Sequence, residues 1–324
     1  MNNGKNKLAT VDLFAGGGGL SFGFANAGFN IVHAFDNWDP AIGFYRRNLL
    51  FPISELDLSC VDALSRIRVL KPDVIIGGPP CQDFSSAGKR DETLGRANLT
   101  LYFANIISGV RPEYFVMENV DRSGKSRTYA KALDIFRTAG YALTIKVLNA
   151  NRCGAPQSRK RLFTLGHLNG PHNFLSESLD RSLSPRPMTL RDYFGDSLGI
   201  EHYYRHPRSY MRRGVFSIDE PSPTIRGVNR PVPGGYKNHP RDSARLSSRI
   251  RPLTTRERSM IQTFPKDIAL VGSKTELEQI IGNAVPVKLA EHVAKRLMSY
   301  HNGQLHLRLN RYESALTPAL VNSV

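Results

Sequence analysis

Residues 78–86 read Gly-Pro-Pro-Cys-Gln-Asp-Phe-Ser-Ser and are the most informative stretch of this chain. The apolar run Val74-Ile75-Ile76 leads into them and predicts a buried parallel strand that ends close to Cys81. In open α/β sheets, ligands bind at the carboxyl ends of the strands. The two prolines fix φ and stiffen the turn. A lone cysteine is most often a buried structural residue, but one held in place at a strand end suits covalent catalysis. The stretch therefore predicts a nucleophile at Cys81.

Short apolar runs alternate with amphipathic stretches on both sides of this motif, from residue 8 to residue 170. The predicted strands are residues 10–14, 31–35, 74–76, 114–117, 141–148 and 161–165. The predicted helices are residues 20–27, 41–48, 99–110 and 130–139. Such alternation predicts an α/β fold: a doubly wound, mostly parallel sheet with helices on both faces.

The alternation stops near Gly170, which predicts a second, smaller domain. Residues 171–250 are rich in Pro, Arg, Ser, Gly and Tyr and contain few periodic apolar segments, so we expect a loop-rich module there. Helical patterning returns at residues 254–264, 276–281 and 285–300, and residues 251–300 are expected to complete the first domain. Residues 301–324 form a C-terminal tail to which the sequence assigns no role.

Composition limits the class of protein. No run of the 324 residues approaches the ~18 apolar residues of a membrane span, and the polar N-terminus lacks the core of a signal peptide. The three cysteines, Cys60, Cys81 and Cys153, have no CxxC spacing, which argues against a disulfide scaffold or a zinc site. We expect a cytoplasmic protein with no metal centre and no membrane contact.

The net charge of +16, from 44 Lys and Arg against 28 Asp and Glu, indicates a polyanionic partner, most often a nucleic acid. A basic protein without such a partner is the alternative. The distribution favours nucleic acid, because eleven Lys and Arg crowd residues 205–251, with Tyr203, Tyr204, Tyr210 and Tyr236 interleaved.

A glycine-rich turn, residues 14–20, lies between the first predicted strand and its helix. Glycines there let a ligand approach the backbone closely, but the spacing is neither that of the Walker motif nor a clean G-x-G-x-x-G. Asp36 ends the second strand, where an acid commonly binds ribose hydroxyls. Trp38 is placed to flank an adenine ring and Asp62 to accept from its amino group, although both acids also suit helix caps. Together they favour an adenosine cofactor.

These residues resemble the cytosine-C5 DNA methyltransferases, over nearly the whole chain and in the family's usual motif order. Residues 12–19 and 36–40, with Asn48 downstream, resemble the first two S-adenosylmethionine motifs. Residues 78–85 resemble the catalytic motif, and residues 117–120 the glutamate motif. The later motifs of the family are matched by residues 157–161, 251–265 and 282–286. One departure is Asp36, which stands where a glutamate is more usual and has a shorter reach toward ribose.

The resemblance implies a class I, Rossmann-like fold with a target recognition domain at 171–250 and S-adenosylmethionine as the cofactor, released as S-adenosylhomocysteine. It implies four catalytic residues: Cys81, Glu118, Arg159 and Arg161. The implied cofactor contacts are Phe14, Ala15, Gly16, Gly18, Leu20, Asp36, Asn37, Trp38, Asp62, Ala63, Pro80, Leu101, Asn283 and Val285. The implied DNA contacts are Ser85, Lys89, Arg90, Arg96, Thr224, Arg226 and Arg230.

The chemistry explains why these residue types are needed. Carbon 5 of cytosine becomes nucleophilic once a thiolate, here Cys81, adds to carbon 6. Glu118 would donate a proton toward N3, which requires a raised carboxyl pKa. Arg161 would steady the O2 side of the base. Arg159 would steady either a phosphate or the end of the base that Glu118 contacts. The base must be flipped out of the duplex, and residues 83–99 would close over it.

The resemblance therefore predicts a DNA (cytosine-5) methyltransferase that acts on a specific duplex sequence as a nucleoid-associated monomer, in a restriction–modification system. An RNA cytosine methyltransferase of the same fold, acting on tRNA, is the alternative in chemistry. A catalytically inactive DNA-binding regulator and a nicotinamide dehydrogenase are alternatives of other classes. The first is disfavoured by the intact catalytic set, and the second by the cysteine motif and the missing G-x-G-x-x-G.

Overall fold

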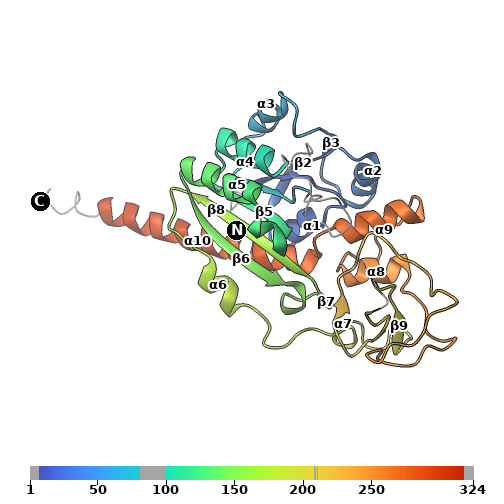
Figure 1. The fold of residues 1–324 in the computed structure, drawn as a ribbon. Helices are drawn as coiled ribbons and strands as arrows, with labels where there is room; N and C mark the ends of the chain where they lie inside the picture. The colour runs from blue at the N-terminus through green and yellow to red at the C-terminus, as the bar shows by residue number, and fades with distance from the viewer. Residues whose placement is uncertain (1–6, 81–98, 208, 210, 317–324) are drawn as a thin grey trace, which may run out of the picture.

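A seven-stranded sheet forms the centre of the structure (Figure 1). The structure is a computed structural model that describes residues 7–80, 99–207, 209 and 211–316, and for residues 305–316 it describes the backbone alone. The strands lie in the order β3-β2-β1-β4-β5-β8-β6. Their bounds are β1 Ala9–Leu13, β2 Asn30–Asp36, β3 Ile53–Glu55, β4 Val74–Gly77, β5 Tyr114–Val120, β6 Tyr141–Asn149 and β8 Lys160–Leu168. Strands β1 to β5 pair in parallel, while β8 is antiparallel to both β5 and β6.

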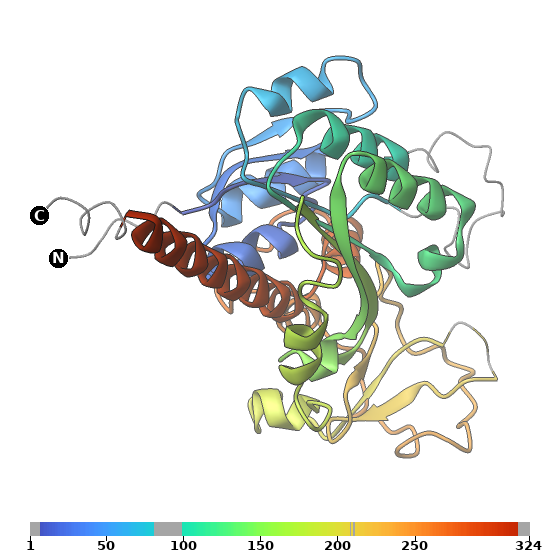
Figure 2. The same ribbon diagram turned by 90° about the vertical axis from the view of Figure 1, so that its left-hand side faces the viewer.

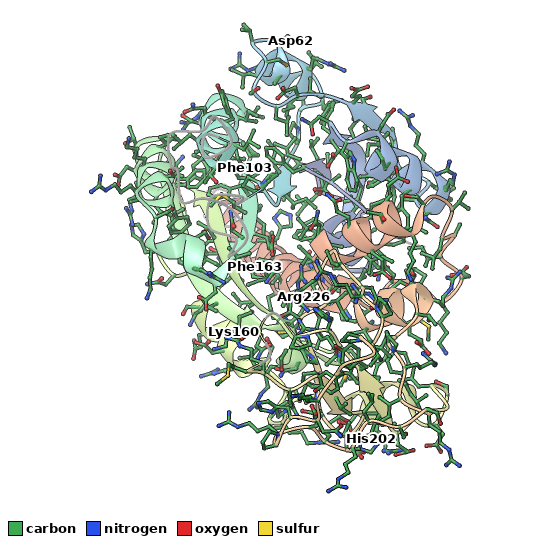
Figure 3. The ribbon with its side chains drawn as sticks, turned by 45° about the vertical axis from the view of Figure 1, so that its right-hand side comes forward. Asp62, Phe103, Lys160, Phe163, His202 and Arg226 are labelled. Carbon is green, nitrogen blue, oxygen red and sulfur yellow. The ribbon has the colours of Figure 1, made fainter. Side chains whose placement is uncertain are left out.

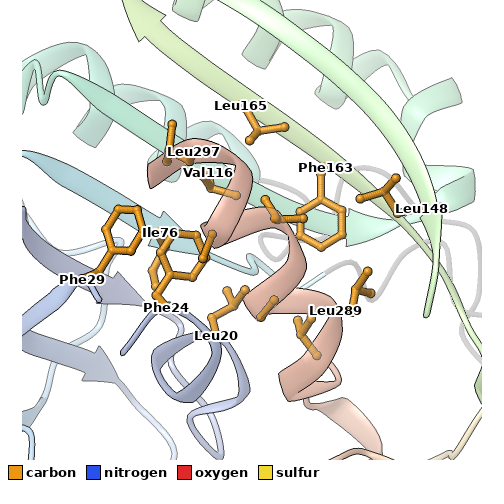
Figure 4. Close-up of a cluster of buried hydrophobic side chains, with 14 of the residues drawn as sticks. Leu20, Phe24, Phe29, Ile76, Val116, Leu148, Phe163, Leu165, Leu289 and Leu297 are labelled. Carbon is orange, nitrogen blue, oxygen red and sulfur yellow. The ribbon is translucent and has the colours of Figure 1, made fainter. Parts of the chain in front are cut away.

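Helices cover both faces of this sheet, so the predicted doubly wound α/β fold is confirmed. One face carries α1 (Gly19–Asn26) and α10 (Val287–Leu316), and the other carries α3 (Ala63–Arg68), α4 (Leu99–Val110) and α5 (Arg127–Thr138). Side chains alternate along the strands: Ile76 and Val116 face α1 and α10, while Ile75 and Phe115 face α4 and α5. Figure 4 shows α10 crossing the first of these faces, with Leu289 and Leu297 against it.

The chain order places a topological switch point in the middle of the sheet. From β1 the chain proceeds outward through β2 to β3 and then returns to add β4 and β5 on the other side of β1. The carboxyl ends of β1 and β4 therefore lie side by side where the order reverses, which is where open α/β sheets bind ligands. The two motifs expected to hold the cofactor and the nucleophile follow these two strands.

A second part, mostly irregular, lies beyond one end of the sheet (Figure 1). It contains α7 (Leu190–Phe194) and an antiparallel ribbon of β9 (His202–Tyr204) and β10 (Val215–Ser217). Its core gathers Leu190, Tyr203, Phe216 and Ile225 with Ile261 of α8 (Thr255–Ile261) and Ile281 of α9 (Lys274–Asn283). The short pair of β7 (Gln157–Ser158) and β11 (Ser222–Pro223) joins this part to the sheet domain. The remaining elements are α2 (Asp39–Asn48), α6 (Ser176–Arg181) and the 3₁₀ turns η2 (Asp121–Lys125) and η3 (Ala150–Arg152).

The packing of α6 indicates that the recognition domain begins later in the chain than residue 171. Leu175 and Leu179, in and next to α6, are buried in the same cluster as α1 and α10, because α6 packs on β6 and α10. The boundary predicted at residue 171 thus falls within the sheet domain's own core. We propose that the recognition domain begins near Leu190, where the second core starts.

Strand β3 and helix α10 both differ from the sequence prediction. Strand β3 was not predicted, since three residues after Pro52 are too few to show a periodic pattern. Helix α10 continues to Leu316, past residue 300, where its amphipathic pattern ends. Figure 2 shows the reason: the last part of α10 extends beyond the body of the protein, so no packing imposes a pattern there. None of the helices described is both long and apolar enough to span a membrane.

Candidate active site

The site is built where β1, β4 and β5 end. Cys81 and four of the predicted DNA contacts, Ser85, Lys89, Arg90 and Arg96, lie outside the described residues. The chain leading to Cys81 is described as far as Pro80. Asn119, at the end of β5, donates from Nδ2 to the Pro79 carbonyl oxygen at 3.2 Å. A Cβ placed on Gly78 would lie 3.1 Å from Oε2 of Glu118. The Glu118 carboxylate therefore lies beside residues 78–80, which come directly before Cys81 in the chain.

Close packing shapes the glycine-rich turn after β1. A Cβ on Gly17 would come within 2.6 Å of Ile280, and one on Gly19 within 2.2 Å of the Val285 carbonyl oxygen. Gly18 has φ of 81° and lies against the rings and methyl groups of α2. Gly16 also has positive φ, but a Cβ there would meet nothing within 4 Å. The turn is thus pressed against the residues that follow α9 on one side and open at Gly16.

The Asp36 carboxylate ties this turn to the next strand. Gly16 N–H donates to Asp36 Oδ2 at 2.7 Å, and Trp38 N–H donates to Oδ1 at 2.9 Å. Burial raises the pKa of Asp36, and the hydrogen bonds from Gly16, Trp38 and Asn37 oppose that change. Asp36 is not a helix cap, because the cap position of α2 is Trp38. Each carboxylate oxygen keeps a lone pair with which to accept from a ligand hydroxyl.

A buried polar chain lies under the same turn and had no role in the sequence prediction. Asp12, fully buried next to the last residue of β1, accepts from the Ser21 hydroxyl at 2.6 Å, and the Tyr45 hydroxyl donates to Ser21 at 2.8 Å. Burial raises the pKa of Asp12 to about 7, because the Ser21 hydrogen bond only partly offsets the lost hydration. Tyr45 also supports Gly18 from below. The three residues therefore fix the start of α1 and the turn before it.

Glu118 and Arg161 form a nearly buried ion pair at the end of β5. Arg161 Nε lies 2.8 Å from Glu118 Oε1, with side-chain exposures of 14% and 11%. Burial raises the pKa of Glu118, and the positive charges of Arg161 and Arg159 reduce that increase. The structure therefore brings three of the four predicted catalytic residues together. A raised pKa increases the protonated fraction of Glu118, as proton donation by its carboxyl requires.

Arg159 had two expected roles, contact with a phosphate or with the Glu118 end. Its side chain is 2% exposed, and its guanidinium donates to the carbonyl oxygens of Ile225 at 2.8 Å and Gly282 at 2.9 Å. This burial favours the role beside Glu118 over a phosphate contact. Its positive charge still acts on Glu118, which lowers the pKa of that carboxyl.

The remaining predicted cofactor residues divide by exposure. Ala15, Leu20, Ala63 and Val285 are buried in the apolar clusters, so only their backbone groups are available to a ligand. Phe14, with φ of 59°, and Leu101 are half-buried at the rim of one cluster, while Asn37, Asp62, Pro80 and Asn283 are exposed. Asp62 accepts from the Cys60 thiol, which lowers its pKa. Figure 3 places Asp62 at one end of the molecule, His202 at the other and Arg226 between them.

Two buried amides link the site to the recognition domain, and the sequence prediction gave them no role. Gln157 accepts from Ile225 N–H at 2.8 Å and donates to Gln262 Oε1 at 2.8 Å. Gln262 in turn donates to the carbonyl oxygen of Ala284 at 3.0 Å. Both belong to quoted motifs, but their contact joins residues 105 apart in the chain, which no local pattern reveals.

The basic residues of the recognition domain divide into two groups. Arg213 pairs with Glu220, Arg226 donates to the His206 carbonyl oxygen and Arg205 donates to the Thr224 carbonyl oxygen. Thr224, a predicted DNA contact, donates its hydroxyl to the Ser158 carbonyl oxygen. Within the described part of the chain, six exposed basic side chains of this region make no hydrogen bond or ion pair: Arg212, Arg230, Lys237, Arg241, Arg245 and Arg249. These six are available to a polyanion.

Comparison with known proteins gives one consistent result. The chain is 55% identical over 296 residues to the Type II methyltransferase M.HgiDI of Herpetosiphon aurantiacus, covering 91% of this chain and 96% of that protein. It is 56% identical to the Type II methyltransferase M.HindV of Haemophilus influenzae, covering 90% and 97%. Among solved structures, S. pombe Dnmt2 methyltransferase matches the fold with a TM-score of 0.69 at 20% identity, over 92% of this chain and 100% of that one. Residues 8–299 match the family described as C-5 cytosine-specific DNA methylase, and the chain therefore belongs to that family.

Proposed function

We propose that this protein transfers a methyl group from S-adenosylmethionine to carbon 5 of a cytosine within a specific duplex DNA sequence, by way of a covalent bond between Cys81 and carbon 6. The observation that carries the proposal is the Glu118–Arg161 pair beside the Gly78–Pro80 turn, in a chain of this family. A buried carboxyl with a raised pKa is placed next to the turn that leads to the only motif cysteine.

The cofactor fits the residues present. The turn after β1 is open at Gly16, and Asp36 keeps acceptor capacity toward it, which suits ribose hydroxyls. Phe14 begins this turn, and Trp38 follows Asp36 at the start of α2; both are half-buried, and we assign them to the methionine part and the adenine ring, respectively. When bound, S-adenosylmethionine supplies an electrophilic methyl group on a sulfonium.

The chain's own residues then carry the remaining chemistry. Glu118 donates its proton to N3 of cytosine while the Cys81 thiolate adds to carbon 6, so the ring gains a proton as it gains the sulfur. After methyl transfer, carbon 5 loses its proton to a base, N3 returns its proton to Glu118, and the thiolate leaves carbon 6, which restores the ring and the free enzyme. Arg161 holds the Glu118 carboxyl in place from the neighbouring strand β8 and reaches the O2 side of the base. Arg159, buried behind them, contributes to lowering the pKa of Glu118.

Target recognition is assigned to the exposed part of the recognition domain. Arg230 is exposed, whereas Arg226 is engaged with the His206 carbonyl oxygen, so we propose Arg230 as the reader of a guanine and Arg226 as a support. Arg241, Arg245 and Arg249 are proposed to contact phosphate. The relatives named above are Type II methyltransferases, which supports a role as the modification enzyme of a restriction–modification system.

The experiment is bisulfite sequencing of DNA from a host that expresses the protein, with a Cys81→Ser strain as the matched control. The proposal expects unconverted cytosines at one recurring sequence in the wild-type strain and none in the control. Parallel sequencing of tRNA distinguishes the RNA alternative. Protection found in tRNA alone, or in neither nucleic acid, would contradict the proposed activity.

A further inference from the structure

A buried ion pair joins α8 to α9 next to the recognition domain. Arg258 and Glu278 have side-chain exposures of 6% and 3%, and Arg258 Nε lies 2.5 Å from Glu278 Oε2. Burial lowers the pKa of Arg258, and the charge of Glu278 opposes that change. Because such pairs lose their hydration, apolar side chains of similar volume are often at least as stabilising. Stability alone therefore does not account for this pair, and its other contacts indicate a role.

One of those contacts stays between the helices, where the Thr255 hydroxyl donates to Glu278 Oε1 at 2.9 Å. The others lead to one segment, Arg226–Asn229. Arg258 Nη2 donates to the Arg226 carbonyl oxygen at the start of the segment. At its end, Asn229 Nδ2 donates to Glu278 Oε1 at 3.1 Å and to the Leu253 carbonyl oxygen at 2.7 Å. The two charged side chains thus hold both ends of a four-residue loop that has no regular secondary structure.

The middle of the segment rests on the backbone of α9. A Cβ on Gly282 would lie 2.2 Å from Gly227 N, and a Cβ on Gly227 would lie 3.3 Å from the Gln279 Cα. On the outer side, Val228 is 57% exposed and Arg230 is exposed directly after the segment. The loop is therefore fixed on its protein side and presents an apolar and a cationic side chain outward.

We propose that Arg258 and Glu278 are positioning residues for target recognition, which hold Arg226–Asn229 so that Val228 and Arg230 meet fixed base pairs of the DNA. The proposal rests on the proposed function. An exposed valine suits the methyl group of thymine, and arginine suits O6 and N7 of guanine. Both contacts require the side chains to approach the base edges at one depth and angle. A loop that is free to shift would therefore discriminate less between sequences, while methyl transfer to carbon 5 of the cytosine continues.

The test compares three variants with the wild-type protein. Arg258→Met with Glu278→Leu replaces the ion pair by apolar side chains of similar size, and Asn229→Ala removes one anchor while leaving the pair intact. Arg191→Met is the control, because Arg191 pairs with Asp219 and Glu201 in the same domain, away from the hydrogen bonds that hold the segment. Thermal unfolding shows whether each variant is folded. Methylation of a randomised duplex library and KM and kcat on the preferred sequence are the readouts.

The proposal expects the double variant and Asn229→Ala to lose about tenfold in preference for the best sequence over single-base-pair changes, the scale of one lost base contact. KM should rise while kcat stays within about threefold, and Arg191→Met should match wild type. If preference is unchanged in both variants, or kcat falls with preference unchanged, the proposal is wrong. If the double variant does not fold, Asn229→Ala alone decides. A wild-type protein that methylates no cytosine would instead contradict the proposed function.

Discussion

At the scale of single residues, Glu118 is the group that we propose as the proton donor. Glu118→Gln keeps the shape of the side chain but removes the transferable proton. We expect kcat to fall by about 10²–10⁴, the usual contribution of general acid catalysis. Single-turnover methyl transfer measures this, with S-adenosylhomocysteine affinity as the control, since Glu118 is not part of the turn after β1. An unchanged rate would remove Glu118 from the chemistry.

The positive charge beside Glu118 predicts a pH effect with a definite sign. Donation requires protonated Glu118, so activity declines as pH rises through its raised pKa. Arg161 lowers that pKa, and Arg161→Met should therefore raise it further. The descending limb of kcat/KM should move to higher pH, besides an overall loss of rate. A limb that moves to lower pH would contradict the assigned electrostatics.

At the scale of elements, the contact between α9 and the segment 226–229 depends on a glycine. Gly282→Ala would place a methyl group 2.2 Å from Gly227 N and 2.3 Å from the Arg226 carbonyl carbon, both backbone atoms. We expect a loss of about 1–3 kcal/mol in the free energy of unfolding, as for other overpacked sites. Denaturant unfolding measures it.

Gly303→Ala is the matched control for this prediction. Gly303 lies in α10 with nothing within 4 Å of the added methyl group. Alanine is the better helix former, so the free energy of unfolding should stay equal or rise by up to about 1 kcal/mol. Equal losses at both positions would mean that helix propensity, and not the contact with Gly227, controls the result.

The elements also show which parts of the fold the sequence reveals. Runs such as Val74–Ile76 and Tyr114–Met117 are buried strands of a parallel sheet, whose apolar character is continuous and easily recognised. The helices α6 and α7 have six and five residues, too few to show a helical period, and were not predicted. The hydrophobic pattern therefore predicts a strand or helix correctly where several consecutive or periodic residues are buried. It fails for a short element that is stabilised by residues far away in the chain.

The same distinction applies to the site. Asp36 and Glu118 stand at the ends of predicted strands, so their place at one edge of the sheet follows from the fold. Arg161 begins β8 and reaches the same edge only because β8 is antiparallel to β5, which the sequence did not reveal. The buried role of Arg159 does not, because its acceptors Ile225 and Gly282 are 66 and 123 residues away. The Arg258–Glu278 pair is equally invisible in the sequence, since charged residues on two helices are ordinarily solvated.

At the scale of the whole molecule, the charge of +16 predicts a strong salt dependence of DNA binding. Arg241→Ala and Arg245→Ala each remove an exposed, unpaired cation of the described recognition domain. We expect each to weaken binding to all sequences and to reduce the slope of log K against log[salt] by about 0.9. Fluorescence anisotropy over a salt series measures this. Arg230→Ala should differ by changing sequence preference, and equal behaviour of all three variants would contradict its role as a base reader.

The account as a whole depends on one covalent bond, between Cys81 and carbon 6 of the target cytosine. The two other cysteines are poor candidates: burial raises the pKa of Cys153 to about 12, and the contact with Asp62 raises the pKa of Cys60. Thiolate formation at both is therefore disfavoured.

Duplex DNA with 5-fluorocytosine at the target position provides the most direct measurement, because fluorine replaces the proton that must leave carbon 5. Incubation with S-adenosylmethionine, followed by protease digestion and mass spectrometry, identifies the attached residue. We predict a stable adduct on the peptide that contains Cys81, and none with Cys81→Ser. An adduct at Cys60 or Cys153, or no adduct from a wild-type protein that methylates ordinary DNA, would contradict the central claim.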